Sequence, residues 1–294
     1  MKHGVKFFLL VGFACLAIGL IGGAISFKDT DFTANSTTID IEKKISAANI
    51  DTLTIKNDIT GVTFIPGNTD EIKVHLVGTI TKSRAKNCTI DAVTEGSNAW
   101  KVNVCPDRKI LLLNFNLDEL KNLIANFNDQ LRTEVTLPNK LYKAITVSSD
   151  TGSLNLKELK AETLTADTNT GTITLDRFEG KQLDLRSDTG SIRVNDGQGN
   201  VRISTNTGTI NSKLHDIGDS VMLDADTGSI KLQLSPAPTS ASFDLSTDTG
   251  RATLDIPGVS VKESDHRSVK GTIGDGSKKI KVKTDTGSVT VTDK

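Results

Sequence analysis

The sequence predicts an all-β protein built as a parallel β-solenoid of about 19-residue rungs, and three observations lead to this prediction. The triplet Asp/Asn-Thr-Gly occurs seven times between Asp150 and Gly287. The first six copies are 18 to 22 residues apart, and the last gap is 37 residues. Apolar and polar residues alternate on both sides of each triplet. A short, nearly fixed period is the signature of stacked repeats that share one core.

Residues at fixed distances from each glycine predict two strands joined by a tight turn. Positions seven and five before the glycine are apolar in every copy, as is the position two after it, and the position three before is always Ser, Thr or Ala. In the first copy these residues are Ile145, Val147, Leu154 and Ser149. Such alternation indicates strands with one buried face, and its phase shifts across the triplet as a turn requires.

We expect the triplets to form a structural ladder of turns. Glycine reaches positive φ without steric cost, and Asp or Asn accepts a backbone hydrogen bond. In chain order Asp and Asn alternate up to Asp226, which separates like charges, and Asp248 breaks the alternation. We expect the 37-residue gap to contain one rung that has lost the motif. The predicted ladder comprises Asp150, Gly152, Asn169, Gly171, Asp188, Gly190, Asn206, Gly208, Asp226, Gly228, Asp248, Gly250, Asp285 and Gly287.

The alternative fold is a sandwich of antiparallel hairpins, because strand direction between rungs is not written in the sequence.

Composition excludes some classes of function. The 294 residues carry a formal net charge of −1, with 4% aromatic residues and a single tryptophan, Trp100. Without a basic excess or an aromatic-basic platform, no nucleic-acid partner is expected. The four histidines are scattered without ligand spacing, so we expect no metal site and no cofactor.

Asp-Thr-Gly is also the active-site triplet of aspartic proteases, which need two aspartates that share a proton. Two copies here carry Asn169 and Asn206 instead, and seven copies suit a ladder better than a catalytic pair. We therefore predict no catalytic residues and no enzyme, with an enzyme acting on cell-wall material as the less favoured alternative. The charged residues Lys157, Glu158, Lys160, Arg177, Lys181 and Arg193 are interpreted as a solvated surface.

The N-terminal part predicts a membrane anchor. Residues 7–27 form a segment without charged residues that is long enough for a transmembrane helix. Lys2 and Lys6 precede it, which places the N-terminus in the cytoplasm and the rest of the chain outside the cell. A cleaved signal peptide is the alternative. The predicted organisation is an anchor at 1–27, a stalk at 28–38, an N-terminal β region at 39–144 and regular repeats at 145–294.

The N-terminal β region is less regular than the repeats. Residues 57–62 look like a degenerate copy of the turn, so the solenoid could begin before Asp150. Residues near 118–128 have helical spacing, either as a helix capping the open end of the solenoid or as one facing a partner or membrane. Cys88 and Cys105 would lie outside the cell, either as a disulfide or as two free thiols.

These features resemble a known family. The N-terminal anchor, the opening strand pair around Asn57 and Gly61, the segment Val135–Pro138 and the rungs of the type Ser149–Leu154 are similar to the bacterial β-strand-repeat family of candidate adhesins, with a layout like that of its membrane-anchored members in Gram-positive bacteria. The resemblance implies a non-catalytic β-solenoid outside the cytoplasm that is linked to the cell-envelope stress response. It implies no catalytic residues. Our hypothesis is that the protein binds a partner protein or another component of the envelope, with a surface adhesin as the alternative.

Overall fold

The computed structural model describes residues 36–106 and 130–293, and these residues confirm the all-β class. They form nineteen strands joined in one hydrogen-bonded system, with one short helix, α2 (Lys82–Ala85). The predicted anchor at 7–27 and the predicted helix near 118–128 lie outside the described residues. In the part of the chain that is described, no helix has the length and apolar character needed to cross a membrane.

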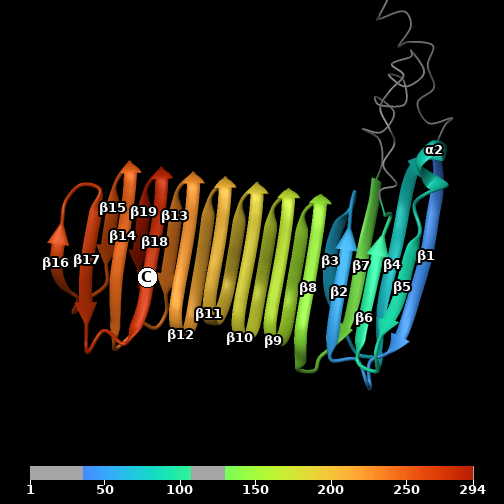
Figure 1. The fold of residues 1–294 in the computed structure, drawn as a ribbon, viewed down its shortest axis with the longest axis horizontal. Helices are drawn as coiled ribbons and strands as arrows, with labels where there is room; N and C mark the ends of the chain where they lie inside the picture. Colours follow the sequence, from blue (N-terminus) through green and yellow to red (C-terminus); the bar gives the residue numbers. More distant parts are fainter. Residues whose placement is uncertain (1–35, 107–129, 294) are drawn as a thin grey trace, which may run out of the picture.

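The centre of the molecule is a stack of parallel strands laid side by side (Figure 1). Each long strand bends, so that its first part follows one triplet and its last part precedes the next. We call the layer of segments that precede the triplets face A (residues 182–189, for example) and the layer that follows them face B (residues 173–175). Because the pairing is parallel, the antiparallel-sandwich alternative is wrong for this region. The strands are β8 (Tyr142–Thr151), β9 (Leu154–Thr170), β10 (Ile173–Thr189), β11 (Ile192–Thr207) and β12 (Ile210–Thr227).

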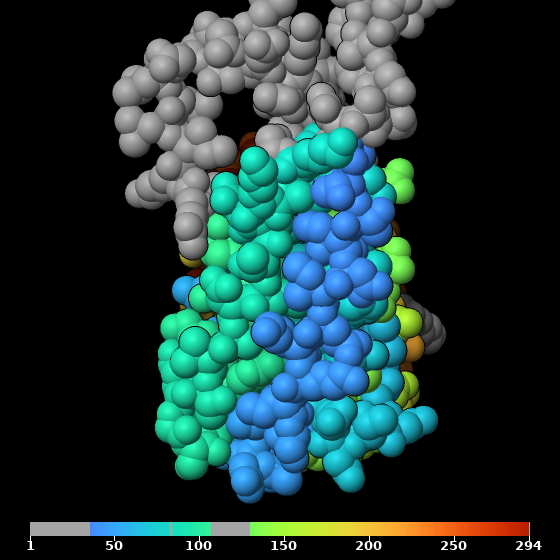
Figure 2. All heavy atoms as spheres, turned by 90° about the vertical axis from the view of Figure 1, so that its right-hand side faces the viewer, coloured from blue at the N-terminus to red at the C-terminus, as the bar shows by residue number. Residues whose placement is uncertain are grey.

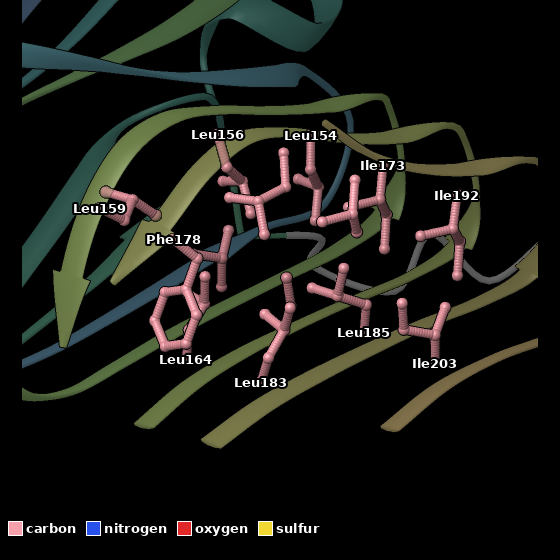
Figure 3. Close-up of a cluster of buried hydrophobic side chains, with 14 of the residues drawn as sticks. Leu154, Leu156, Leu159, Leu164, Ile173, Phe178, Leu183, Leu185, Ile192 and Ile203 are labelled. Atoms are coloured by element: carbon pink, nitrogen blue, oxygen red, sulfur yellow. The ribbon is translucent and has the colours of Figure 1, made fainter. Parts of the chain in front are cut away.

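The core lies between the two faces, as the alternation predicts. Leu154, Ile173 and Ile192 from face B form a row opposite Leu185 and Ile203 from face A (Figure 3), and none of these side chains is exposed. Each residue pairs with its counterpart one rung away, for example Ile173 with Leu154 and Ile192. Stacking therefore merges the small apolar surface of each rung into one continuous core.

At the N-terminal end the rungs do not stack in chain order. β2 and β3 pair with β8 and β9 on one side and with β6 and β7 on the other. The later strands β6 and β7 thus form the outer rung, and residues 105–129 connect them where other rungs have a short turn. The strands are β1 (Ser36–Ser46), β2 (Thr52–Asn57), β3 (Gly61–Gly67), β4 (Glu71–Thr81), β5 (Ile90–Glu95), β6 (Ala99–Val104) and β7 (Gln130–Pro138).

Antiparallel strands cover this end of the stack. β4 pairs with β7 and β1 with β4 on face B, while β5 pairs with β6 on face A. Figure 2 looks onto this end, which is covered by blue and cyan atoms of the N-terminal region. A disulfide joins Cys88 to Cys105, which settles the alternative left open by the sequence. Cys105 has a φ of 46° and directly follows β6, so the bridge holds the chain where it leaves the outer rung.

The C-terminal end departs from chain order in the same way, and the prediction of a lost rung is wrong. β18 lies between β12 and β14, and β19 lies between β13 and β15 (Figure 1). The 37-residue gap instead contains two antiparallel strands, β16 and β17, which extend the sheet beyond β14. The strands are β13 (Ile230–Leu234), β14 (Ala241–Thr249), β15 (Ala252–Asp255), β16 (Ser260–Ser264), β17 (Ser268–Ile273), β18 (Lys278–Thr286) and β19 (Val289–Thr292).

Charge gives a physical reason for this insertion. The outward residues of β12 and β14 include the carboxylates Asp224 and Asp244, whereas β18 carries Lys281 and Lys283. In the observed register Asp224 pairs with Lys283, and Asp244 pairs with Lys281. Opposite charges across neighbouring strands stabilise a sheet, and like charges destabilise it. The lysine-rich strand therefore separates two acidic ones.

Candidate functional site

The turns form one continuous column along a narrow edge of the stack. Backbone hydrogen bonds connect them, because each glycine N–H donates to the threonine carbonyl of the next turn. For Gly152 and Thr170 the distance is 2.9 Å, and for Gly228 and Thr286 it is 2.8 Å. The spatial order of the glycines is Gly152, Gly171, Gly190, Gly208, Gly228, Gly287 and Gly250. The predicted ladder residues are thus together, with Asp285 and Gly287 inserted before Asp248 and Gly250.

Glycine is required in the column by close approach as well as by φ. At Gly228, where φ is +144°, an added Cβ would lie 1.7 Å from the carbonyl oxygen of Gly208. Because that neighbour is backbone, no rotamer change could relieve the clash, and only glycine permits this spacing of turns.

A buried hydroxyl ladder runs beside the glycines, formed by the small residue three positions before each one. The hydroxyl donates to the glycine carbonyl of the adjacent rung, at 2.8 to 3.2 Å. The donors are Thr168, Ser187, Thr205, Thr284 and Thr247. Ala225 occupies the equivalent place beside Gly208 and has no hydroxyl. Sequence reasoning recognised only that this residue is small; the signal it missed was that six of the seven carry a hydroxyl.

The Asp/Asn row is exposed or half-buried on the same edge. The Asn169 amide donates to the Asp150 carboxylate at 3.3 Å, as alternation along the column favours. In space Asp285 lies between Asp226 and Asp248, so the alternation still fails directly after Asp226, but the next carboxylate is that of Asp285 and not that of Asp248.

Lys283 compensates for these adjacent carboxylates. Its ammonium lies 2.7 Å from Asp285, and that hydrogen bond, together with the charges of Asp285, Asp224 and Asp248, raises the pKa of Lys283. Elsewhere on face A, burial raises the pKa of the Asp167 carboxyl, and the neighbouring Arg186 opposes that shift. Across residues 36–106 and 130–293, no group of three or more His, Cys, Asp or Glu could hold a metal ion.

Ion pairs between successive rungs line the opposite narrow edge. Lys160 pairs with Glu179 at 3.2 Å, Lys181 with Glu162 at 2.7 Å, and Arg177 with Asp196 at 3.2 Å. They are exposed or half-buried and contribute little to stability individually. Three of the basic residues interpreted as a solvated surface, Lys160, Arg177 and Lys181, therefore form ion pairs at this edge. Arg193 lies elsewhere.

Arg193 lines a shallow hollow on face B, which we call the basic groove. The groove has a volume of about 470 Å³ and crosses β11, β12, β13 and β19. Its cations are Arg193, Lys213 and Lys231, beside the amides of Asn195, Asn211 and Gln233, and no Asp or Glu lines it. Sequence reasoning missed the groove because its cations are 18 to 20 residues apart and meet only when the rungs stack.

The parallel stack and its glycine column define a repeat protein of solenoid-like, all-β architecture. The chain belongs to the DUF4097 family, described as Toastrack, whose model matches residues 50–292. No curated protein matches the chain.

Solved structures similar to this chain include a candidate cell adhesion protein from Clostridium sporogenes, at 15% identity, covering 88% of this chain and 100% of that one with a TM-score of 0.37. A candidate adhesin from Bacteroides fragilis is 13% identical over 86% of this chain and 96% of that one, with a TM-score of 0.39. Another from Parabacteroides distasonis is 12% identical over 86% and 97%, also with a TM-score of 0.39.

Proposed function

We propose that this protein is a non-catalytic binding module, anchored in the cell membrane by residues 7–27, with its strand stack outside the cytoplasm. There it binds a protein or another component of the cell envelope. The turn column is the observation that carries this proposal, because it repeats one exposed arrangement along the length of a rigid stack. Repeat architectures of this kind use extended surfaces for binding.

The finer proposal concerns the cellular setting. In size and layout the chain is similar to LiaG, the membrane-anchored product of the Lia cell-envelope-stress operon of Bacillus-type bacteria. The uncharged segment at 7–27, the opening strand pair and the repeated Ser-Asp-Thr-Gly rungs support this placement. On this proposal the module supports the response to antibiotics that act on the cell wall, through a partner in the membrane or envelope.

Site-specific photocrosslinking in intact cells tests the binding proposal. A crosslinking residue at Thr207, exposed on the turn column, is compared with one at Lys181, exposed on the opposite edge. We expect adducts with envelope components from Thr207, increasing when a wall-active antibiotic is present, and fewer from Lys181. If neither position captures anything in either condition, the binding proposal is wrong.

A surface adhesin is the second candidate, which the family resemblance suggests. It requires that deletion of residues 145–294 abolish attachment of cells to a surface while the chain is still exported. An enzyme acting on cell-wall material is the less favoured alternative. It requires that the purified residues 36–294 release soluble products from isolated walls.

A further inference from the structure

Among the described residues, the cations of the basic groove have no carboxylate partners, and no acidic residue lines the groove. None of the ion pairs among residues 36–106 and 130–293 involves Arg193, Lys213 or Lys231. All three side chains are exposed. By contrast, at the narrow edge opposite the turn column, Lys160, Arg177 and Lys181 each pair with an acidic residue one rung away. Unpaired, exposed cations gathered in an acid-free hollow attract an anionic ligand.

The arrangement of the cations suits an extended ligand rather than a single small anion. Arg193 and Lys231 occupy equivalent positions two rungs apart, which places their backbones roughly 10 Å from each other. Lys213 belongs to the intervening rung and is displaced two residues along the strand, roughly 8 Å from each of the others. A ligand that meets all three must therefore carry several negative charges along its length.

Acidic residues mark both ends of the groove. Asp176 lies beyond Asn195 and accepts a hydrogen bond from its amide at 2.9 Å. Asp255 pairs with Thr292 at the other end. A polyanion is thus favoured over β11, β12 and β13 and repelled beyond them, which limits binding to these rungs.

The remaining lining groups indicate a hydroxyl-rich chain. Asn195, Asn211, Gln233 and Thr290 offer amide and hydroxyl groups, and no aromatic residue lines the groove. A nucleic acid would use aromatic stacking, and a peptide would use apolar pockets, neither of which is present here.

We propose that the basic groove binds a linear phosphodiester polymer of a polyol, with Arg193, Lys213 and Lys231 contacting its phosphates and the amides contacting its hydroxyls. Arg and Lys both bind phosphate oxygens, Arg through paired N–H groups and Lys as a point charge. The proposal rests on the extracytoplasmic placement proposed above, because it gives the envelope-binding function a specific ligand class.

The test measures binding of a short, fluorescently labelled glycerol-phosphate oligomer to the full chain in detergent, by polarisation. We expect saturable binding that weakens as salt rises, because exposed charges are screened. The double variant Lys213→Glu, Lys231→Glu should bind roughly tenfold more weakly. Lys157→Glu is the matched control, on the same face and in the same outward row but beside Asp176, and it should bind as wild type does.

Several results would overturn the proposal: no binding by wild type, equal binding by the double variant, or equal competition by an uncharged polyol. Displacement of the labelled oligomer by single-stranded oligothymidylate at a far lower concentration than by unlabelled glycerol-phosphate oligomer would assign the groove to nucleic acid instead. Unchanged thermal unfolding of the double variant shows that weaker binding is not misfolding. Failure here leaves the crosslinking from Thr207 to decide the broader proposed function independently.

Discussion

The centre of the stack and its two ends are built from the same rung but assembled differently. Between β8 and β12 each rung is laid beside the one before it in the chain. At the N-terminal end β2 and β3 lie between the later strands β6 and β7 and the central stack, and at the C-terminal end β18 and β19 lie inside the earlier β14 and β15. Rung geometry alone therefore does not set rung order; the side chains that face outward between neighbouring rungs contribute as well.

Deletion of residues 278–294 tests this difference most strongly. It removes Ile280, Val282, Val289 and Val291, all buried, from the interior of the column. At about 1.5 kcal/mol or more for each side chain, the loss is about 6 kcal/mol, comparable with the whole stability of many domains. We expect loss of hydrogen-exchange protection in β12 and β14. Deletion of residues 293–294 alone should leave protection unchanged, and intact protection in the larger deletion would contradict the inserted order.

Gly228→Ala tests the column where the central and inserted rungs meet. The added Cβ clashes with the Gly208 carbonyl, so we expect a loss of about 4 kcal/mol in the free energy of unfolding. Gly96→Ala is the matched control, since Gly96 also has positive φ, at +67°, but has open space around it. It should cost only about 1 to 2 kcal/mol. Equal losses in denaturant titrations would show that φ, and not the close stacking, requires glycine.

Removal of the Cys88–Cys105 disulfide affects only the N-terminal end. The bridge closes a loop with a sequence separation of 17, for which chain entropy predicts a stabilisation of about 3 kcal/mol. The variant Cys88→Ser, Cys105→Ser should unfold at lower denaturant, as should wild type in dithiothreitol. Dithiothreitol should have no further effect on the double variant. If the reduced wild type is as stable as the oxidised protein, the bridge does not stabilise this end.

Ala225→Ser is expected to have the smallest effect and the opposite sign. It adds the missing hydroxyl beside the Gly208 carbonyl, and one net hydrogen bond contributes about 1 kcal/mol. The control Ala166→Ser places a hydroxyl at a fully buried core position and should be destabilising. Thermal unfolding compares the two variants with wild type. A destabilising Ala225→Ser would mean that this step of the hydroxyl ladder lacks room for a donor.

The structure of a single rung could be predicted from the sequence, but the order of the rungs in space could not. Alternation around each triplet predicts the burial of Ile145, Val147 and Leu154, because successive side chains of a strand point to opposite sides and here only one side is apolar. The rung of Gly287 has the same alternation as the others, so nothing local indicates that it lies between Gly228 and Gly250. That choice depends on contacts between distant strands, such as Asp224 with Lys283.

The basic groove could not be predicted from the sequence for a related reason, because it too depends on which residues of different rungs lie side by side. Arg193, Lys213 and Lys231 come from three rungs, and each looks like an ordinary surface residue in its own segment. They meet because the rungs stack with a period that varies by one or two residues from rung to rung. The hydroxyl ladder could have been predicted from the sequence, since Ser or Thr at one fixed position of the repeat already suggests a hydrogen bond.

The insertion of β18 and β19 has a consequence for the making of the protein. These strands are synthesised after every strand that they separate. Until they are made, the acidic residues of β12 and β14 lack lysine partners on β18, and the core between these strands is not filled. A copy that stops short of residue 278 cannot close the column, however well its earlier rungs have formed. Since cellular proteases remove chains that remain unfolded, folding itself distinguishes complete copies of this domain from truncated ones.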